Sequence, residues 1–124
     1  MNRNILILAG ILGALSVAIG AFGAHGLKPL LIDNGRVETF ETAVKYQFYH
    51  TLAIFGLGIL MLKYPNKQFK YATFCMVLGI LVFSGSLYIL CLTNLTVLGA
   101  ITPIGGVMFI LGWIFMAMGA KKTF

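Results

Sequence analysis

Four long apolar runs, separated by short polar stretches, make up most of this chain. They cover residues 5–27, about 44–62, 71–92 and about 95–120. Residues 5–24 are twenty uncharged positions, which as a helix would be about 30 Å long, the thickness of the hydrocarbon core of a bilayer. The pattern predicts an all-α integral membrane protein: a four-transmembrane-helix bundle forming a single membrane domain over residues 1–124, with a short amphipathic helix between the first two spans.

Small residues recur along one face of the first run. They are Ala9, Gly13, Ser16, Gly20 and Gly23, spaced by four and three residues. Because small residues let helix backbones approach closely in lipid, this seam predicts that the first helix is a packing centre for the others. Similar seams in the last two runs contain Gly79, Gly105 and Gly112. One of these seams is a candidate interface for a homo-oligomer.

Residues 28–45 form the longest polar stretch and contain all three acidic residues of the chain. Lys28-Pro29 should end the first helix, because proline cannot continue it. From Arg36 the apolar spacing is helical, and Glu41 precedes Lys45 by four residues, the favourable order for a helical ion pair. We expect an amphipathic lead-in at the membrane surface that runs into the second span.

The beginning of the last run leaves two alternatives, because it contains Pro103. A helix that begins at Pro103, with Thr102 as its cap, has sixteen residues up to Met118, about 24 Å, which is short for a span. A helix that begins near Leu95 includes Pro103 and should be kinked there. In both cases residues 102–106 depart from an ideal helix, which is tolerated at membrane depth only where protein or water supplies hydrogen-bond partners.

The composition also favours the membrane. The chain is 60% hydrophobic and 10% charged, with a mean hydropathy of +0.97, whereas soluble domains have about 25% charged residues. The net charge of +6 is spread over short loops without an arginine-rich face, so we expect membrane lipids and no nucleic acid as partners. Arg3 precedes the first run, and Ala21-Phe22-Gly23 resembles the small-residue cleavage site of a secretory signal. The apolar run is longer than those of secretory signals, which favours an uncleaved helix.

The basic residues predict the orientation. With four spans, the two termini and the turn near residue 65 share one side, which holds six Lys and Arg residues. The opposite side holds three, Lys28, Arg36 and Lys45, together with the three acids. The positive-inside rule then predicts a multi-pass protein of the cell (inner) membrane with both termini in the cytoplasm.

Polar residues from all four spans fall at similar depth when helical rise is counted from the cytoplasmic boundary. The candidate binding residues of this polar layer are His25, Glu41, Tyr46, Gln47, His50, Ser84, Ser86 and Thr102. Glu41 and His50 are nine residues apart and would lie on opposite faces of a continuous helix. Tyr46, four residues before His50, is therefore the more plausible local partner.

Two alternatives stay open for these side chains. His25 and His50 together are candidates for a metal site, a haem site or a proton relay, whereas each alone would bond a helix end or a nearby carbonyl. No further ligand stands at metal-binding spacing, so no metal, cofactor or catalytic residue is assigned. A nucleophilic Ser84 would need His50 as its base, whereas hydroxyls in membrane helices commonly bond the backbone or another helix.

Four motifs resemble one known family. They are residues 20–27 (GAFGAHGL), 40–50 (FETAVKYQFYH), 83–88 (FSGSLY) and 102–106 (TPIGG), with Gly112-Trp113 following. In this order, over essentially the whole chain, they resemble domain-of-unknown-function family 423, the YwdK- and YgdD-like small membrane proteins, which are similar to the eukaryotic transmembrane protein 256 family. The resemblance implies about four membrane helices and supplies no activity or catalytic residue.

Three hypotheses for the function follow. The favoured one, suggested by the small-residue seams, is a non-enzymatic structural, assembly or lipid-binding component. The second is an oligomeric small transporter or channel in which the polar layer lines a pathway, since interrupted helices commonly mark transporter sites. The third is a membrane enzyme, or a haem or metal carrier, that uses the two histidines.

Overall fold

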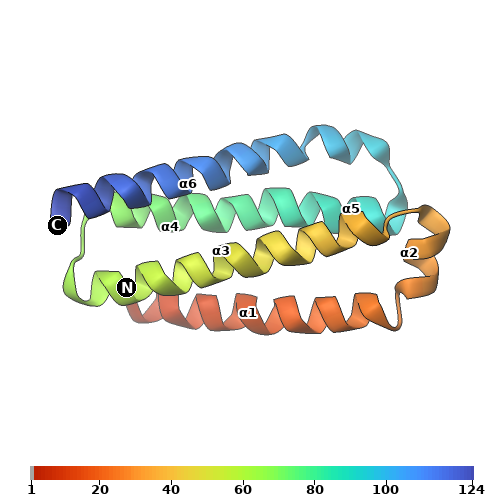
Figure 1. Ribbon diagram of the computed structural model, residues 1–124, viewed down its shortest axis with the longest axis horizontal. Coiled ribbons are helices and arrows are strands. Elements are labelled where there is room, and N and C mark those ends of the chain that lie inside the picture. The colour runs from red at the N-terminus through yellow and green to blue at the C-terminus, as the bar shows by residue number, and fades with distance from the viewer. Residues whose placement is uncertain (1) are drawn as a thin grey trace.

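The computed structural model describes residues 2–124, and all regular secondary structure in that range is helical. The elements are α1 (Asn2–Ala24), α2 (Lys28–Asn34), α3 (Val37–Lys63), α4 (Lys67–Gly79), the π-helix η1 (Ile80–Ser84), α5 (Gly85–Thr93), the 3₁₀ helix η2 (Thr96–Ala100) and α6 (Thr102–Thr123). Because α4, η1 and α5 follow one another without a break, they form one long rod beside α1, α3 and α6 (Figure 1).

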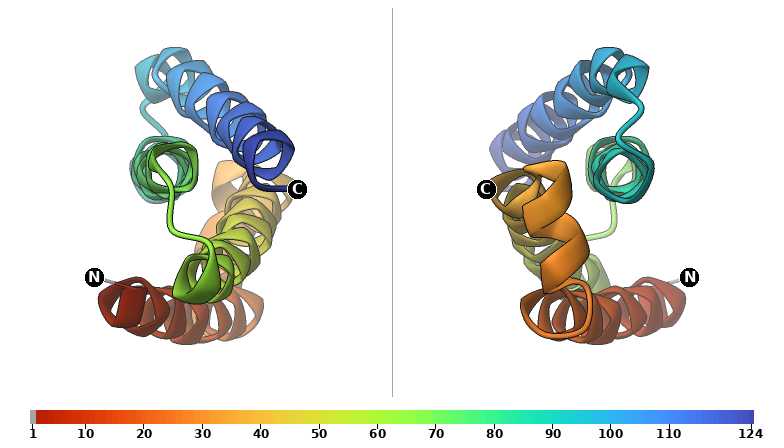
Figure 2. Two further views of the ribbon diagram at one scale, coloured as in Figure 1. Left: turned by 90° about the vertical axis from the view of Figure 1, so that its left-hand side faces the viewer. Right: turned by 90° about the vertical axis from the view of Figure 1, so that its right-hand side faces the viewer.

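The rods are stacked in the order α6, α4–α5, α3 and α1, with α1 and α6 on opposite outer sides (Figure 2). α3 packs on α1 along one side and on α4, η1 and α5 along another, while α6 packs mainly on α4 and η1. Both termini lie at the end that contains the turn between α3 and α4, and α2 lies at the opposite end (Figure 1).

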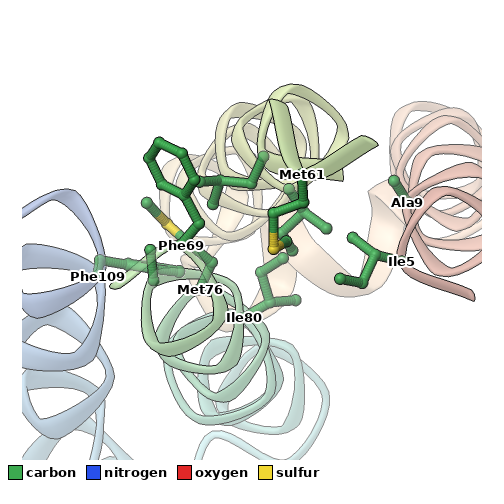
Figure 3. Packing of buried hydrophobic residues seen from close by; sticks show 10 residues of the cluster. Ile5, Ala9, Met61, Phe69, Met76, Ile80 and Phe109 are labelled. Atoms are coloured by element: carbon green, nitrogen blue, oxygen red, sulfur yellow. The ribbon is translucent and has the colours of Figure 1, made fainter. Parts of the chain in front are cut away.

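The main core lies where α1, α3, α4 and α6 meet. Its buried side chains include Ile5, Ala9, Met61, Phe69, Met76, Ile80 and Phe109 (Figure 3). Phe69, Ala72, Met76 and Ile80 recur at three- and four-residue spacing, so they form the inward stripe of the α4 rod. The outer faces remain apolar: Val17 is 66% exposed and Phe74 64%. A lipid-facing surface accounts for such exposed apolar side chains.

Three helices in residues 2–124 are long and apolar enough to cross a membrane by length and composition: Arg3–Ala24, Lys67–Thr93 and Thr96–Thr123. α3 is also long, at 27 residues, but Tyr46, Gln47, Tyr49 and His50 make its first half less apolar. The sequence predicted four crossings, and the one by α3 stays a prediction.

The polar stretch after α1 differs from expectation. α1 ends at Ala24 rather than Leu27, and α2 begins at Lys28 with Pro29 in its first turn. Proline is favoured there because its missing N–H would have no partner in the helix. The residues expected as an amphipathic lead-in belong to α3 itself, which is continuous from Val37 to Lys63.

The expectation that the first helix is a packing centre is wrong. Only 17% of the most apolar stretch of α1 is buried, against 50% in the α4–α5 rod, because α1 places its small-residue face on α3. α3 contacts α1 as well as α4, η1 and α5, so it has the central position.

The last apolar run forms two helices. α6 begins at Thr102 with Pro103 in its first turn, so this proline kinks no helix. Residues 96–100 form the separate η2.

Candidate functional site

The predicted packing glycines of α1 all face α3. A Cβ added at Gly13 would lie 3.7 Å from Thr51, and one at Gly20 would lie 3.3 Å from Val44. At Gly23 it would overlap the ring of Phe40, 2.7 Å from Cδ1. The glycines therefore permit the close packing of the α1–α3 pair.

The glycines of the other two seams face helices of the same chain as well. A Cβ at Gly79 would overlap the Phe109 ring, one at Gly105 would overlap the backbone of Phe83, and one at Gly112 would lie 3.1 Å from Met76. The seams that suggested a homo-oligomer interface thus contact neighbouring helices within one chain, and the oligomeric state stays a prediction.

His50 is a buried side chain with both ring nitrogens engaged. The indole Nε1 of Trp113 donates to Nε2 of His50 at 3.1 Å, and Nδ1 lies 2.7 Å from the carbonyl oxygen of Tyr46. Because Nε2 accepts, the proton must be on Nδ1, which donates to that carbonyl; the imidazole is therefore neutral. Its ring stacks on Phe109, with centroids 3.6 Å apart and planes inclined by 10°. Neither nitrogen is free to bind a metal or a haem in this arrangement.

The structure does not bring His25 and His50 together. His25 is exposed in the turn that follows α1. Gly13 packs beside Thr51, and His25 is twelve residues further along the chain, about 18 Å by helical rise. Residues 2–124 also contain no group of three or more His, Cys, Asp or Glu side chains that could hold a metal ion.

Gln47 joins three helices. Its Nε2 donates to the carbonyl oxygen of Leu12 in α1 at 3.1 Å, and its Oε1 accepts a hydrogen bond from the hydroxyl of Tyr88 in α5. The sequence predicted Gln47 as part of the polar layer, but Tyr88 was present only within the motif at residues 83–88. Trp113 was present only as part of a motif. Their role was missed because a single sequence does not tell which distant side chains meet.

The three hydroxyl residues of the polar layer also bond within the chain. Ser84, at the end of the π-helix η1, donates to the carbonyl oxygen of Ala43 in α3 at 2.8 Å. The hydroxyls of Ser86 and Thr102 are 2.7 Å apart and link α5 to α6. In the described residues every buried side-chain nitrogen and oxygen has a hydrogen-bond partner. Five residues of the polar layer thus form interhelical hydrogen bonds that position the helices: Gln47, His50, Ser84, Ser86 and Thr102.

An open cavity lies elsewhere, at the end of the molecule that carries α2. It has a volume of about 290 Å³ between the last turns of α1, α2 and the first turns of α3. Its charged lining residues are Lys28, Glu41 and Lys45, and the others are Gly20, Gly23, Ala24, Leu31, Val37, Phe40 and Val44. Glu41 therefore belongs to this cavity, and Tyr46, Gln47, His50, Ser84, Ser86 and Thr102 do not line it.

A second hollow continues the first along the α1–α3 pair. It has a volume of about 460 Å³ and is lined by Ser16, Val17, Gly20, Ala21, Val44, Lys45, Phe48 and Tyr49. The two share Gly20, Val44 and Lys45. We call the pair the α1–α3 groove. Its lining is charged near α2 and almost wholly apolar further along α3, an arrangement that suits an amphiphilic molecule. The sequence did not indicate this groove, because its two lysines belong to separate segments of the chain.

Comparisons with known proteins show the family of the chain. The model of a protein family described as "Protein of unknown function (DUF423)" matches residues 19–106. The UPF0382 inner membrane protein YgdD of Escherichia coli (strain K12) is 43% identical over 98% of this chain and 92% of its own length. The UPF0382 membrane protein YwdK of Bacillus subtilis (strain 168) is 43% identical over 94% of this chain and 95% of its own length.

No solved structure matches the chain. The UPF0382 membrane protein SH2409 of Staphylococcus haemolyticus (strain JCSC1435) is likewise 43% identical, over 94% of both chains. The matched region contains the residues of the α1–α3 contact near the groove, the polar layer and the beginning of α6. This chain therefore belongs to the DUF423 family of membrane proteins of unknown function.

Proposed function

We propose that this protein is a non-enzymatic component of the membrane that crosses the bilayer four times and binds lipid in the α1–α3 groove. The observation that carries the proposal is the cavity of about 290 Å³, which combines an apolar lining with two lysines and one glutamate at one end. A membrane lipid has the same division into a charged head and apolar chains. The rest of the surface offers large apolar side chains of the kind a lipid-facing helix carries.

The state of the polar layer supports a non-enzymatic role. Catalysis by Ser84 would require a base within hydrogen-bond reach, but its hydroxyl donates to the Ala43 carbonyl, and His50 is bonded to Trp113 and Tyr46. A haem would require a free imidazole nitrogen at His50, and a proton relay would require partners that exchange protons, whereas the partners of His50 are an indole N–H and a backbone carbonyl. Purified protein should therefore be colourless and free of bound metal. A haem absorption band, or stoichiometric metal, would refute this part of the proposal.

Retention of lipid during purification tests the groove. We expect phospholipid to remain with the wild-type protein in mild detergent, as measured by native mass spectrometry. Ala21→Trp places a large ring in the second hollow, which Ala21 lines, and should reduce the retained lipid. Ala14→Trp is the matched control, because Ala14 is an exposed residue of the same helix that does not line the groove. Equal lipid content in the two variants would refute the proposed site.

The four crossings need a separate test. Twenty residues ending at Leu62 begin at Ala43, so α3 is long enough to cross although its first half is polar. Reporter proteins fused to either terminus should then both report the cytoplasmic side. A cysteine introduced at the exposed Asp33 should react with a membrane-impermeant maleimide added from outside. Termini on opposite sides would mean that α3 does not cross.

A further inference from the structure

The α1–α3 groove has a charge pattern that selects among lipids. In the described residues, Lys28, Glu41 and Lys45 line the same cavity and form no ion pair with one another or with other side chains. Two positive charges and one negative charge leave the cavity with a net charge of +1. A groove with this charge pattern attracts a ligand with one negative charge close to an apolar segment.

The depth of the cavity matches that of a phospholipid head group. If α3 crosses with twenty residues ending at Leu62, its hydrocarbon section begins at Ala43. Lys28 and Glu41 then lie outside this boundary, and Lys45 is close enough to extend its amine to it. The second hollow, lined by Phe48 and Tyr49 of α3, lies on the hydrocarbon side. Head group and acyl chain would thus each meet a lining of matching polarity.

We propose that the groove binds an anionic glycerophospholipid, with its phosphate between Lys28 and Lys45 and one acyl chain in the second hollow. This inference rests on the proposed lipid-binding function and adds the class of lipid. Phosphate is a strong acceptor for lysine amines, and the small side chains of Gly20 and Ala21 leave room for a chain against α1. Glu41 repels a second negative charge, which favours a head group with one.

The test compares lipids that share acyl chains and differ in head group. Wild-type protein in mild detergent is titrated with phosphatidylglycerol, phosphatidylethanolamine and phosphatidylcholine, and bound lipid is counted by native mass spectrometry. We expect phosphatidylglycerol to bind about 10- to 30-fold more tightly than phosphatidylcholine, because both lipids offer a phosphate but only phosphatidylcholine carries an ammonium group, which the two lysines repel. Lys28→Gln with Lys45→Gln should abolish this preference. Lys67→Gln with Lys70→Gln, at the opposite end of the molecule (Figure 1), is the control and should retain it.

Glu41 separates an anionic lipid from a zwitterionic one. With an anionic occupant, Glu41→Gln removes a repulsive charge and should leave the affinity for phosphatidylglycerol unchanged or increased. If phosphatidylethanolamine were the preferred occupant, its ammonium would pair with Glu41, so the wild-type protein would bind it more tightly than phosphatidylglycerol and Glu41→Gln would remove that preference; that result would overturn the inference.

The other results of the titration distinguish a failure of the proposed lipid class from a failure of lipid binding itself. Equal affinity of the three lipids for the wild-type protein, or a preference that survives the Lys28 and Lys45 substitutions, would overturn the anionic site and leave lipid binding standing. Binding of none of the three would overturn the proposed function itself.

Discussion

At Gly105 the backbone of α6 closely approaches the backbone of η1, and its substitution gives a direct test of the packing. A Cβ added there would lie 2.6 Å from Cβ and 2.7 Å from Cα of Phe83 in η1. Carbon atoms in favourable contact are about 3.5–4.0 Å apart. Because the overlap involves main-chain atoms, rotation of a side chain cannot relieve it, and Gly105→Ala must move α6 away from η1 by roughly 1 Å.

The cost follows from that displacement. Overpacking of this kind costs typically about 1–3 kcal/mol, and the movement would also lengthen the 2.7 Å contact between the hydroxyls of Ser86 and Thr102. Gly106→Ala is the matched control, since the nearest atom to its added Cβ is Cδ2 of Phe83 at 4.0 Å. It should be neutral, or stabilising by up to about 1 kcal/mol through helix propensity.

Reversible unfolding in mixed micelles measures both variants. The chain has a single tryptophan, Trp113, whose indole bonds His50, so its fluorescence should report the separation of α6 from α3. We expect the Gly105→Ala transition at lower denaturant than wild type, and the Gly106→Ala transition at the wild-type value or above. If the two variants unfold together, the close approach of α6 to η1 is not what holds these helices.

Three further tests of the polar contacts use the same unfolding measurement. Trp113→Phe leaves Nε2 of His50 without its donor and should cost about 1–3 kcal/mol, the penalty for a buried unsatisfied acceptor; an unchanged midpoint would contradict the assigned tautomer. A double-mutant cycle of Gln47→Leu and Tyr88→Phe should give a coupling of about 0.6 kcal/mol and at most about 1.7, as between helices in a membrane, whereas additive effects would mean that the two side chains do not interact. Asn66→Ala removes the cap of α4, whose side chain accepts from the Phe69 N–H at 2.9 Å, and should cost about 1 kcal/mol; no loss would exclude a role for this cap.

The small-residue spacing predicted correctly which face of α1 contacts protein. Ala9, Ser16 and Gly23 are buried, as a 4-3 repeat on one helix face requires. The repeat could not say how many helices would use that face. Whether α1 packs on one partner or several depends on how all the rods stack, and the structure gives the central position to α3.

The candidate site illustrates the same limit. Counting helical rise placed His50 and Ser84 at one depth, but depth along a helix does not determine which side chains meet across helices. The π-helix η1 helps to set the direction of Ser84 towards the Ala43 carbonyl, and no local pattern announced it. The sequence did not predict that Lys28 and Lys45 line one cavity, because they belong to segments that meet only after α1 and α3 fold together.

The sequence alone determined the membrane character, the helical rods and the inward faces of α1 and α6. These properties follow from composition and from the 3.6-residue period, which are local and additive along the chain. The tertiary structure decided the neutral tautomer of His50, the separation of His25 from it and the groove between α1 and α3. Each of these depends on which distant segments become neighbours. The local patterns of a single sequence do not tell which segments will meet, because many arrangements of the helices satisfy the same patterns.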